Sequence, residues 1–543
     1  MTLYYIENMK IKNNLINKPF KVLFIYPNAA MMNPAPISIG IFTAILKEKG
    51  VNVDLFDTTF YRDKGDVAWD KSKEALMQVL PADDSIRESK IITTDMEQDL
   101  RNKVDEFKPD FIMISVLELS MRTAARLLKA IRHYDVPVLA GGVLAYSAPE
   151  LVLNNKDVDY VGLGEVEGLV ADICVKFSKG EDICNIVNLA YIEDGVVIKN
   201  KLRALEDVNN LPIADFSLFK PERLLRPMGG KVWITLPIET NRGCPYKCTF
   251  CNSPFTLKMY KDDGQGFFRK KTAETIDKEL DYLIRRHNIN YIYFTSDTFI
   301  IFNNEEFDLF CQMYEKYRLP FWIQTRAETI TKERVERLAE IGLHRMSMGL
   351  EHGNEEFRKN VIKKPFDNET MIEATRIVTE AGIPLTVNNI IAFPGETREL
   401  VFDTIELNRN LKFESINCVP FAPFHGTDLQ KLAVKLGYVE ENHTPGSLNM
   451  TSPMDQPQLP AKEVQGLVRT FPMYVRFPKE HWPIIKKAEQ DDDIYESLRK
   501  EYKKQFFNIE GDEDELNFDK NYSVLEGHIL SNDDITTNAP EYD

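Results

Sequence analysis

Three cysteines are the residues of this sequence whose type and spacing point most directly to chemistry. Cys244, Cys248 and Cys251 form the pattern C-x3-C-x2-C in the segment ETNRGCPYKCTFCNSP. Thiolates are soft ligands that suit iron–sulfur clusters, and this spacing lets one loop hold three corners of a four-iron cluster. Because no fourth cysteine lies nearby, one iron would keep an open coordination position, as a reactive metal centre requires. The triplet therefore predicts an iron–sulfur cluster with room for a ligand.

Two other uses of the triplet fit less well. A structural zinc site generally closes with four ligands, and the fifty residues after Cys251 contain only His287, within an expected helix, as a further candidate. A redox dithiol would need only two cysteines. The four other cysteines lie singly along the chain, and we interpret them as small buried hydrophobic residues.

The elements around the triplet alternate between strand and helix. Residues 230–425 contain six apolar runs typical of strands, separated by amphipathic helical patterns. Six consecutive βα units predict a partial (β/α)6 or complete parallel barrel, whose chemistry lies at the C-terminal rim of the strands. The cysteine loop follows the first of these runs directly. The expected strands are 232–239, 291–295, 321–326, 345–351, 384–393 and 415–421.

An earlier stretch, residues 20–200, shows the same alternation. Its apolar runs predict an α/β domain with a doubly wound parallel sheet covered by helices on both faces. Ligands of such sheets bind at the carboxyl ends of the strands. The expected strands are 22–26, 53–57, 111–115, 136–140 and 159–164, and the residues at their ends include Asn28, Ser115, Gly141, Gly142, Gly162, Gly164 and Glu165.

The remaining segments complete four expected regions. A polar linker, 194–217, separates the first domain (20–200) from the barrel (228–428). Residues 429–510 predict a helical domain, and the acidic, Asn-rich tail 511–543 has the composition of a disordered segment.

Composition limits the classes of function. The formal net charge of the 543 residues is −17, which argues against a nucleic-acid partner. No apolar run approaches the roughly 20 residues of a transmembrane helix, and the first twenty residues lack the apolar core of a secretory signal. Seven cysteines, an odd number, argue against a disulfide framework. We therefore expect a cytoplasmic protein without a transmembrane segment.

The cysteine pattern, with Phe250 before its last member, resembles the signature of the radical S-adenosylmethionine (SAM) superfamily. In that family the open iron of a [4Fe-4S] cluster chelates SAM. One electron then cleaves SAM to methionine and a 5′-deoxyadenosyl radical, which abstracts hydrogen from the substrate.

Further short motifs carry the same resemblance. FTSDTF (294–299) is similar to F-x-D-D-x-F, MGLEHGNEEF (348–357) to G-x-E-S-G, and IIAFPGET (390–397) to I-I-G-L-P-G-E-T. Ser296 and Ala392 depart from the usual acid and glycine. Glu351 would accept the ribose hydroxyls of SAM, and Arg326 would face the cofactor. The residues that the resemblance places around SAM are Phe250, Ser296, Asp297, Arg326, Glu351 and Phe393.

The first domain resembles the cobalamin-binding domain that precedes the barrel in one subgroup of this superfamily. The resemblance rests on KPDFIMISVLELS, VPVLAGGVLAYSAPE and VDYVGLGEVEG, with Leu144 where a histidine is usual. It implies a cobalamin site at Ser115, Gly141, Gly142, Gly162, Gly164 and Glu165. The loop YPNAAMMNPAPISIG holds no histidine, so no histidine of this loop would ligate the cobalt.

The resemblance implies a cobalamin-dependent radical enzyme that methylates an unactivated carbon of a small-molecule, lipid or natural-product substrate. Two alternatives stay open: a radical cyclase, oxidase or rearrangement enzyme without methyl transfer, and a cobalamin or redox sensor without turnover. Methylthiolation of tRNA would usually need a second cluster in the first domain, where no cysteine precedes Cys174. We expect reduced flavodoxin or ferredoxin as electron donor, with the run 269–271 and Lys247 as candidate docking residues. Catalytic residues beyond the cluster remain unassigned.

Overall fold

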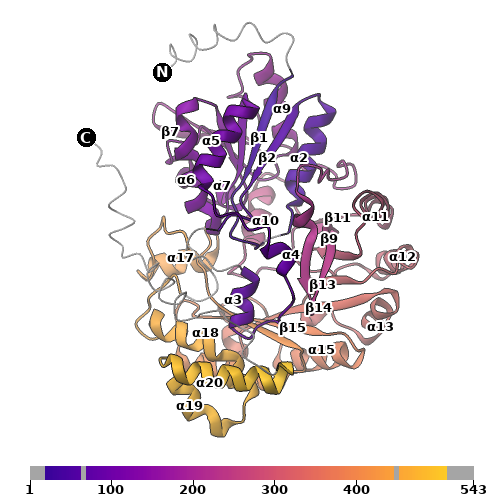
Figure 1. Ribbon diagram of the computed structural model, residues 1–543, viewed down its shortest axis with the longest axis vertical. Coiled ribbons are helices and arrows are strands. Elements are labelled where there is room, and N and C mark those ends of the chain that lie inside the picture. Colours follow the sequence, from indigo (N-terminus) through magenta and orange to yellow (C-terminus); the bar gives the residue numbers. More distant parts are fainter. Residues whose placement is uncertain (1–18, 33, 63–68, 446–451, 510–543) are drawn as a thin grey trace.

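The computed structural model describes residues 19–32, 34–62, 69–445 and 452–509, and Figure 1 shows their arrangement. The tail 511–543, for which the composition predicts disorder, lies outside the described residues. None of the helices in the described ranges is both long and apolar enough to cross a membrane.

The N-terminal domain is built on a seven-stranded sheet of order β2-β1-β3-β4-β5-β6-β7. The strands from β2 to β5 in this order are parallel, as their apolar runs predict. Buried residues of α2 and α9 pack on one face of the sheet, and those of α5, α6 and α7 pack on the other. The doubly wound arrangement is therefore confirmed. The strands are β1 (Lys21–Tyr26), β2 (Asn52–Asp57), β3 (Phe111–Ser115), β4 (Val138–Gly141) and β5 (Tyr160–Gly162), and the helices are α2 (Ile37–Glu48), α5 (Met96–Phe107), α6 (Met121–Ile131), α7 (Val143–Ser147), α8 (Pro149–Leu153) and α9 (Glu167–Ser178).

Two antiparallel strands that the sequence did not predict extend this parallel sheet at one edge. β6 (Leu189–Glu193) pairs with β5, and β7 (Val196–Lys199) pairs with β6. β7 lies in the segment that we predicted to be a polar linker. The sequence did not predict β7, because the hairpin tip is polar and an edge strand needs only one buried face.

The second sheet has the order β16-β15-β14-β13-β12-β9-β8, in which six strands from β9 to β16 are parallel. Among the described strands, β8 and β16 form its two edges, so the barrel is partial. All six predicted strands are present. They are β9 (Lys231–Glu239), β12 (Tyr291–Thr295), β13 (Phe321–Thr325), β14 (Leu343–Glu351), β15 (Leu385–Ile391) and β16 (Ser415–Pro420), with β8 (Leu225–Met228) antiparallel to β9 and a separate pair β10 (Asn241–Arg242) and β11 (Arg269–Lys270).

Helices alternate with the barrel strands, and their ends follow from the sequence. Thr272 accepts a hydrogen bond from the backbone N–H of Thr275 and begins α11, and Thr331 begins α13 in the same way. Gly342, with φ of 118°, ends α13 in the left-handed conformation. The helices of this domain are α10 (Ser253–Asp262), α11 (Ala273–His287), α12 (Asn304–Tyr314), α13 (Lys332–Ile341), α14 (Glu355–Asn360), α15 (Asn368–Glu380) and α16 (Arg398–Arg409).

The C-terminal helices pack on the last barrel strands together with a segment of the N-terminal domain (Figure 1). Leu76 and Met77 are buried in this apolar cluster, and Gln78 donates a 2.7 Å hydrogen bond to the backbone oxygen of Cys418. The segment that contains α3 (Trp69–Ala75) and α4 (Ser85–Glu88) therefore crosses from the first domain to the far side of the barrel. The C-terminal helices are α17 (Asp428–Lys435), α18 (Ala461–Arg476), α19 (Trp482–Ala488) and α20 (Asp492–Tyr502).

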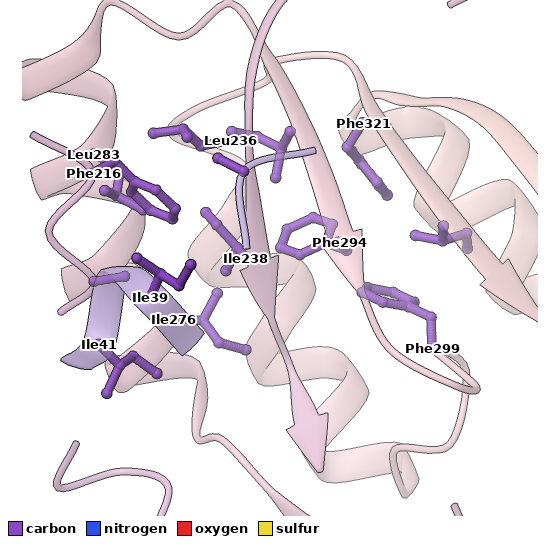
Figure 2. Packing of buried hydrophobic residues seen from close by; sticks show 14 of the residues in the cluster. Ile39, Ile41, Phe216, Leu236, Ile238, Ile276, Leu283, Phe294, Phe299 and Phe321 are labelled. Atoms are coloured by element: carbon purple, nitrogen blue, oxygen red, sulfur yellow. The ribbon is translucent and has the colours of Figure 1, made fainter. Parts of the chain in front are cut away.

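One hydrophobic core joins the two sheets. Figure 2 shows Ile39 and Ile41 of α2 beside Phe216 of the connecting segment and Ile238 of β9. A Cβ atom on Gly40 would lie 2.8 Å from the Cβ of Ala214, so α2 and the connecting segment are closely packed. The part of the predicted linker nearest the barrel is thus a packed segment of the core, which fixes the two domains relative to each other.

Gly141 and Gly142 at the end of β4 provide a matched pair for testing this geometry. Gly142 has φ of 104° and ψ of 174°, and an added Cβ would lie 2.6 Å from the backbone oxygen of Val116. An added Cβ on Gly141 would meet no atom within 4 Å. We expect Gly142→Ala to lower the free energy of unfolding by about 2–4 kcal/mol and Gly141→Ala to change it by less than about 0.5 kcal/mol. Thermal and urea unfolding of the cofactor-free proteins would measure both values, and equal effects would contradict this account.

Candidate active site between the two sheets

The cysteine loop starts where β9 ends and is held by the elements on both sides of it. Gly243 has φ of 80°, and a Cβ atom there would lie 2.6 Å from the Phe267 ring, so the turn into the loop requires glycine. The hydroxyl of Thr249 donates a 2.7 Å hydrogen bond to the Val361 carbonyl, and Asn252 donates one of 2.8 Å to the carbonyl of His425. The loop is therefore fixed to the end of α14 and to the segment after β16.

Each of the three thiols has a polar neighbour. The Sγ of Cys244 lies 3.7 Å from the Thr298 hydroxyl, and the Sγ of Cys251 lies 3.5 Å from the backbone N–H of Ser253. Arg326 donates a 3.2 Å hydrogen bond to the Sγ of Cys248. Among the described residues, no three His, Cys, Asp or Glu side chains converge on a position for a single metal ion.

Burial controls the protonation of these thiols. It raises the pKa of the Cys251 thiol to about 11, and the Asp297 carboxylate adds to the shift. Burial also raises the pKa of Cys244. Both thiols are neutral near pH 7 unless a cation displaces the proton, as iron does when it binds thiolate. Soft, buried sulfur donors on one loop, with hydrogen-bond donors to sulfur, fit an iron–sulfur cluster.

Arg326 follows β13 and is almost fully buried. Its guanidinium lies 3.8 Å from the centre of the Tyr246 ring and forms an ion pair with Glu328. With its bond to Cys248, these contacts fix the cation beside the cysteine loop. Its position relative to SAM stays a prediction.

The residues after β12 are placed directly beside the cysteine loop. The Ser296 hydroxyl donates a hydrogen bond to the side-chain oxygen of Asn241, and the Asp297 carboxylate accepts a 2.8 Å bond from the hydroxyl of Ser253. Ser296 stands where the resembled motif has an acid, and its hydroxyl binds Asn241 just before the cysteine loop. Both residues also line the cavity described below.

Glu351 and Phe393 lie at the ends of β14 and β15 and have different surroundings. Glu351 is 8% exposed, and its carboxylate lies 2.9 Å from the Nζ of Lys364. The Phe393 ring is fully buried, 6.2 Å from that of Phe250 and 6.3 Å from that of His352. Phe393 therefore packs near both Phe250 of the cysteine loop and His352, while Glu351 presents a polar group.

A cavity of about 420 Å³ separates the carboxyl ends of the two sets of strands. Met113 and Leu139 line it from the N-terminal sheet, and Asn241, Thr295 and Gln324 line it from the barrel. Several residues that the resemblance assigns to cobalamin or to SAM line this one cavity. They are Ser115, Gly141, Gly142, Gly164, Glu165, Ser296 and Asp297. The structure thus brings together two groups of residues that lie far apart in the sequence.

Glycines shape the wall of this cavity that belongs to the N-terminal domain. The Cα of Gly141 faces open space. A Cβ atom on Gly164, whose φ is 68°, would lie 2.2 Å from the Tyr260 hydroxyl of the barrel domain. Gly162 lies behind the wall, where its Cβ would lie 2.7 Å from Val166. At Gly141, backbone atoms can therefore approach a large planar ligand without a side chain between them, whereas Gly164 is required by its contact with Tyr260.

An ion-pair network that the sequence motifs did not reveal closes one side of the cavity. Arg242 donates a 2.6 Å hydrogen bond to Glu167 and one of 3.0 Å to Glu239, and it lies 3.4 Å from Glu165. Arg269 binds Glu165 as well. These carboxylates hold the pKa of Arg242 above its usual range. A basic residue two positions before the first cysteine was the available signal, but Glu165 and Glu167 come from the other domain.

The side chains of the basic run 269–271 all form ion pairs within the chain, which corrects our hypothesis that the run docks an electron donor. Arg269 pairs with Glu165, Lys270 with Glu306, and the buried Lys271 with Glu279 at 2.6 Å. Each of these cations already has a carboxylate partner. Only Lys247 of the proposed docking residues is exposed.

Comparisons with known proteins agree with this geometry. Residues 238–407 match the family model of the radical SAM superfamily, and residues 73–173 match that of the B12 binding domain. This chain is a radical SAM enzyme with a B12-binding domain. The radical SAM domain implies a [4Fe-4S] cluster and SAM as cofactors, and the B12-binding domain implies cobalamin.

Relatives of this radical SAM enzyme include methyl- and methylthiotransferases. An uncharacterized methyltransferase of Pyrococcus horikoshii is 27% identical over 62% of this chain and 72% of its own length. A putative methylthiotransferase of Methanocaldococcus jannaschii is 25% identical over 55% of this chain and 65% of its own. The radical SAM methyltransferase TsrM from Kitasatospora setae, solved with cobalamin and a [4Fe-4S] cluster, has a similar fold. Its TM-score is 0.59 at 17% identity, over 78% of this chain and 79% of that chain.

The contact between Arg326 and Cys248 predicts a change in the cluster's reduction potential. A guanidinium that donates to a cluster thiolate stabilises the more negative, reduced state. We expect Arg326→Met to lower the potential by roughly 65–130 mV, the one-electron equivalent of the ~1.5–3 kcal/mol of a hydrogen bond to a charged group. Redox titration monitored by electron paramagnetic resonance would measure it. The control is Lys247→Met, which removes an exposed cation and should leave the potential unchanged. An unchanged potential in Arg326→Met would contradict the assigned role of Arg326.

Proposed function

We propose that this enzyme transfers a methyl group from SAM to an unactivated carbon of a small-molecule, lipid or natural-product substrate, with cobalamin as carrier. One observation carries the proposal: residues of the cobalamin side, such as Gly141, and of the cluster side, such as Asp297, line the same cavity. A methyl carrier and a radical generator must act on the same carbon, so both must reach one enclosed space.

The cofactors would supply the difficult chemistry, and the protein would hold and shield them. Overall, one substrate C–H bond becomes C–CH3 while two SAM molecules and two electrons are consumed. The other products are S-adenosylhomocysteine, methionine and 5′-deoxyadenosine, which takes the substrate hydrogen. Within the chain, Glu351 would bind the nucleoside, and Arg326 would stabilise the cluster thiolates. Residues of both sheets line the cavity, so a radical formed there would have protein on two sides.

A test of the function can begin without the substrate. Reconstituted protein, cobalamin, SAM with a labelled methyl group and titanium citrate should give label in the corrin and S-adenosylhomocysteine. Addition of a small-molecule extract should then move the label into a product and increase 5′-deoxyadenosine. Cys251→Ala should lose 5′-deoxyadenosine formation, since it removes one cluster ligand. Turnover to 5′-deoxyadenosine with no label in corrin or product would contradict methyl transfer and favour a radical cyclase, oxidase or rearrangement enzyme.

The electron donor would dock on lysines beside the cluster loop. Lys247, Lys359 and Lys363 are exposed, and none forms an ion pair with a residue in the described ranges. They lie together because the backbone N–H of Thr249 donates a 3.1 Å hydrogen bond to the carbonyl of Ile362. Three unpaired cations next to the cluster ligands, on a chain of net charge −17, favour an acidic electron carrier such as a flavodoxin or ferredoxin.

Charge reversal tests this docking surface. We expect Lys247→Glu, Lys359→Glu and Lys363→Glu together to slow cluster reduction by a reduced flavodoxin at least about tenfold at low salt. Reduction by titanium citrate should be unchanged. The matched control is Lys49→Glu, Lys129→Glu and Lys179→Glu, which changes the net charge equally on exposed lysines of the N-terminal domain. Stopped-flow absorbance would give the rates, and equal slowing in both triple variants would exclude a specific surface.

A further inference from the structure

The carboxyl end of β14 holds a residue in an unfavourable backbone conformation. Glu351 has φ of 68°, in the left-handed region that side chains other than glycine seldom adopt. Its strand pairing is irregular at this point, where Glu351 rather than the residue before it faces Asn389 of β15. Such strain persists only where neighbouring contacts fix the residue, and it is concentrated at functional sites.

Lys364 provides those contacts. Its Nζ donates to the Oε1 of Glu351 at 2.9 Å and also to the backbone oxygen of Gly349. The side chains of Lys364 and Glu351 are 4% and 11% exposed, so solvent screens this pair little. A Cβ atom on Gly349 would lie 2.0 Å from the Oε1 of Glu351. Only glycine at this position allows the carboxylate to fold back onto the lysine.

This arrangement leaves one carboxylate oxygen for a ligand. Lys364 binds Oε1, and Oε2 of Glu351 forms no hydrogen bond with the residues that the structure describes. The neighbouring His352 does not compete for it, because its Nδ1 accepts a hydrogen bond from the backbone N–H of Asn354 and its Nε2 lies 3.1 Å from Glu396. An ionised carboxylate only accepts hydrogen bonds, so Oε2 fits a ligand that presents hydroxyl groups.

We propose that Lys364 is a positioning residue that sets the sugar specificity of the SAM site. This proposal rests on the proposed function in one respect, which is that the nucleoside of SAM binds at Glu351. Lys364 fixes Oε1 and thereby orients Oε2 toward the ribose hydroxyls. Without the lysine, the carboxylate is free to rotate, and the site loses its means of distinguishing a ribose from a sugar without hydroxyls.

The test compares two ligands on cluster-loaded protein by calorimetry without turnover. The ligands are SAM and its 2′,3′-dideoxyribose analogue. We expect the unchanged enzyme to prefer SAM by about 10- to 100-fold, the range of a hydrogen bond to a charged group, and Lys364→Met to reduce the preference to less than about threefold. Lys364→Arg should keep most of it. The control Lys412→Met, a change at an exposed lysine outside the proposed sites, should keep all of it.

The outcomes separate three explanations. If Lys364→Met weakens both ligands equally and the preference persists, Lys364 is only a structural residue and the proposal is wrong. If Glu351→Met, which removes the acceptor, also retains the preference, the ribose binds elsewhere and the proposal is wrong. Since binding is measured without turnover, a failure to detect methyl transfer would leave this result intact. Lys364→Arg and the cluster content of each variant control for misfolding.

Discussion

The contact on which the site depends is the one between Arg242 and carboxylates of both domains. Arg242 stands two residues before Cys244 and binds Glu239 at the end of β9 and Glu167 on the N-terminal domain, with Glu165 close by. All four side chains are less than one-fifth exposed. Removal of one partner from such a buried pair typically costs 3–5 kcal/mol, because the other charge remains unpaired. The cluster loop is thereby tied directly to the cobalamin side of the cavity.

Arg242 fixes the orientation of the two domains, and this orientation explains where several residues with positive φ angles lie. The carboxyl ends of the strands of the two sheets face each other. The loops that follow these strands, which carry glycines or a specific polar group, therefore meet at the cavity. Gly142 and Gly164 have positive φ angles on one side, and Glu351 and Ala392 have them on the other. Ala392, with φ of 65°, stands where the resembled motif has glycine, which allows this backbone at no steric cost. At Glu351 and Ala392 this strain lies at strand ends, where ligands bind in such folds.

Local patterns predicted the parts of the fold that depend on nearby residues. The strands of the barrel, the caps at Thr272 and Thr331 and the cysteine loop all follow from spacing within about fifteen residues. Contacts between distant segments could not be predicted in this way. The hydrogen bond from Gln78 to Cys418 joins residues 340 positions apart, and no periodicity marks it. The internal role of Arg269, Lys270 and Lys271 was missed for the same reason, since Glu165, Glu306 and Glu279 lie elsewhere in the chain.

The central claim is that cobalamin and the iron–sulfur cluster share one cavity. The most direct measurement is the magnetic interaction between cob(II)alamin and the reduced cluster in the reconstituted enzyme, by electron paramagnetic resonance. Both centres are paramagnetic in these states, and dipolar coupling falls steeply with their separation. The account predicts that reduction of the cluster broadens the cob(II)alamin signal and speeds its relaxation, and that this effect is lost in Cys244→Ala. A cob(II)alamin signal that is the same with and without the reduced cluster would contradict the account.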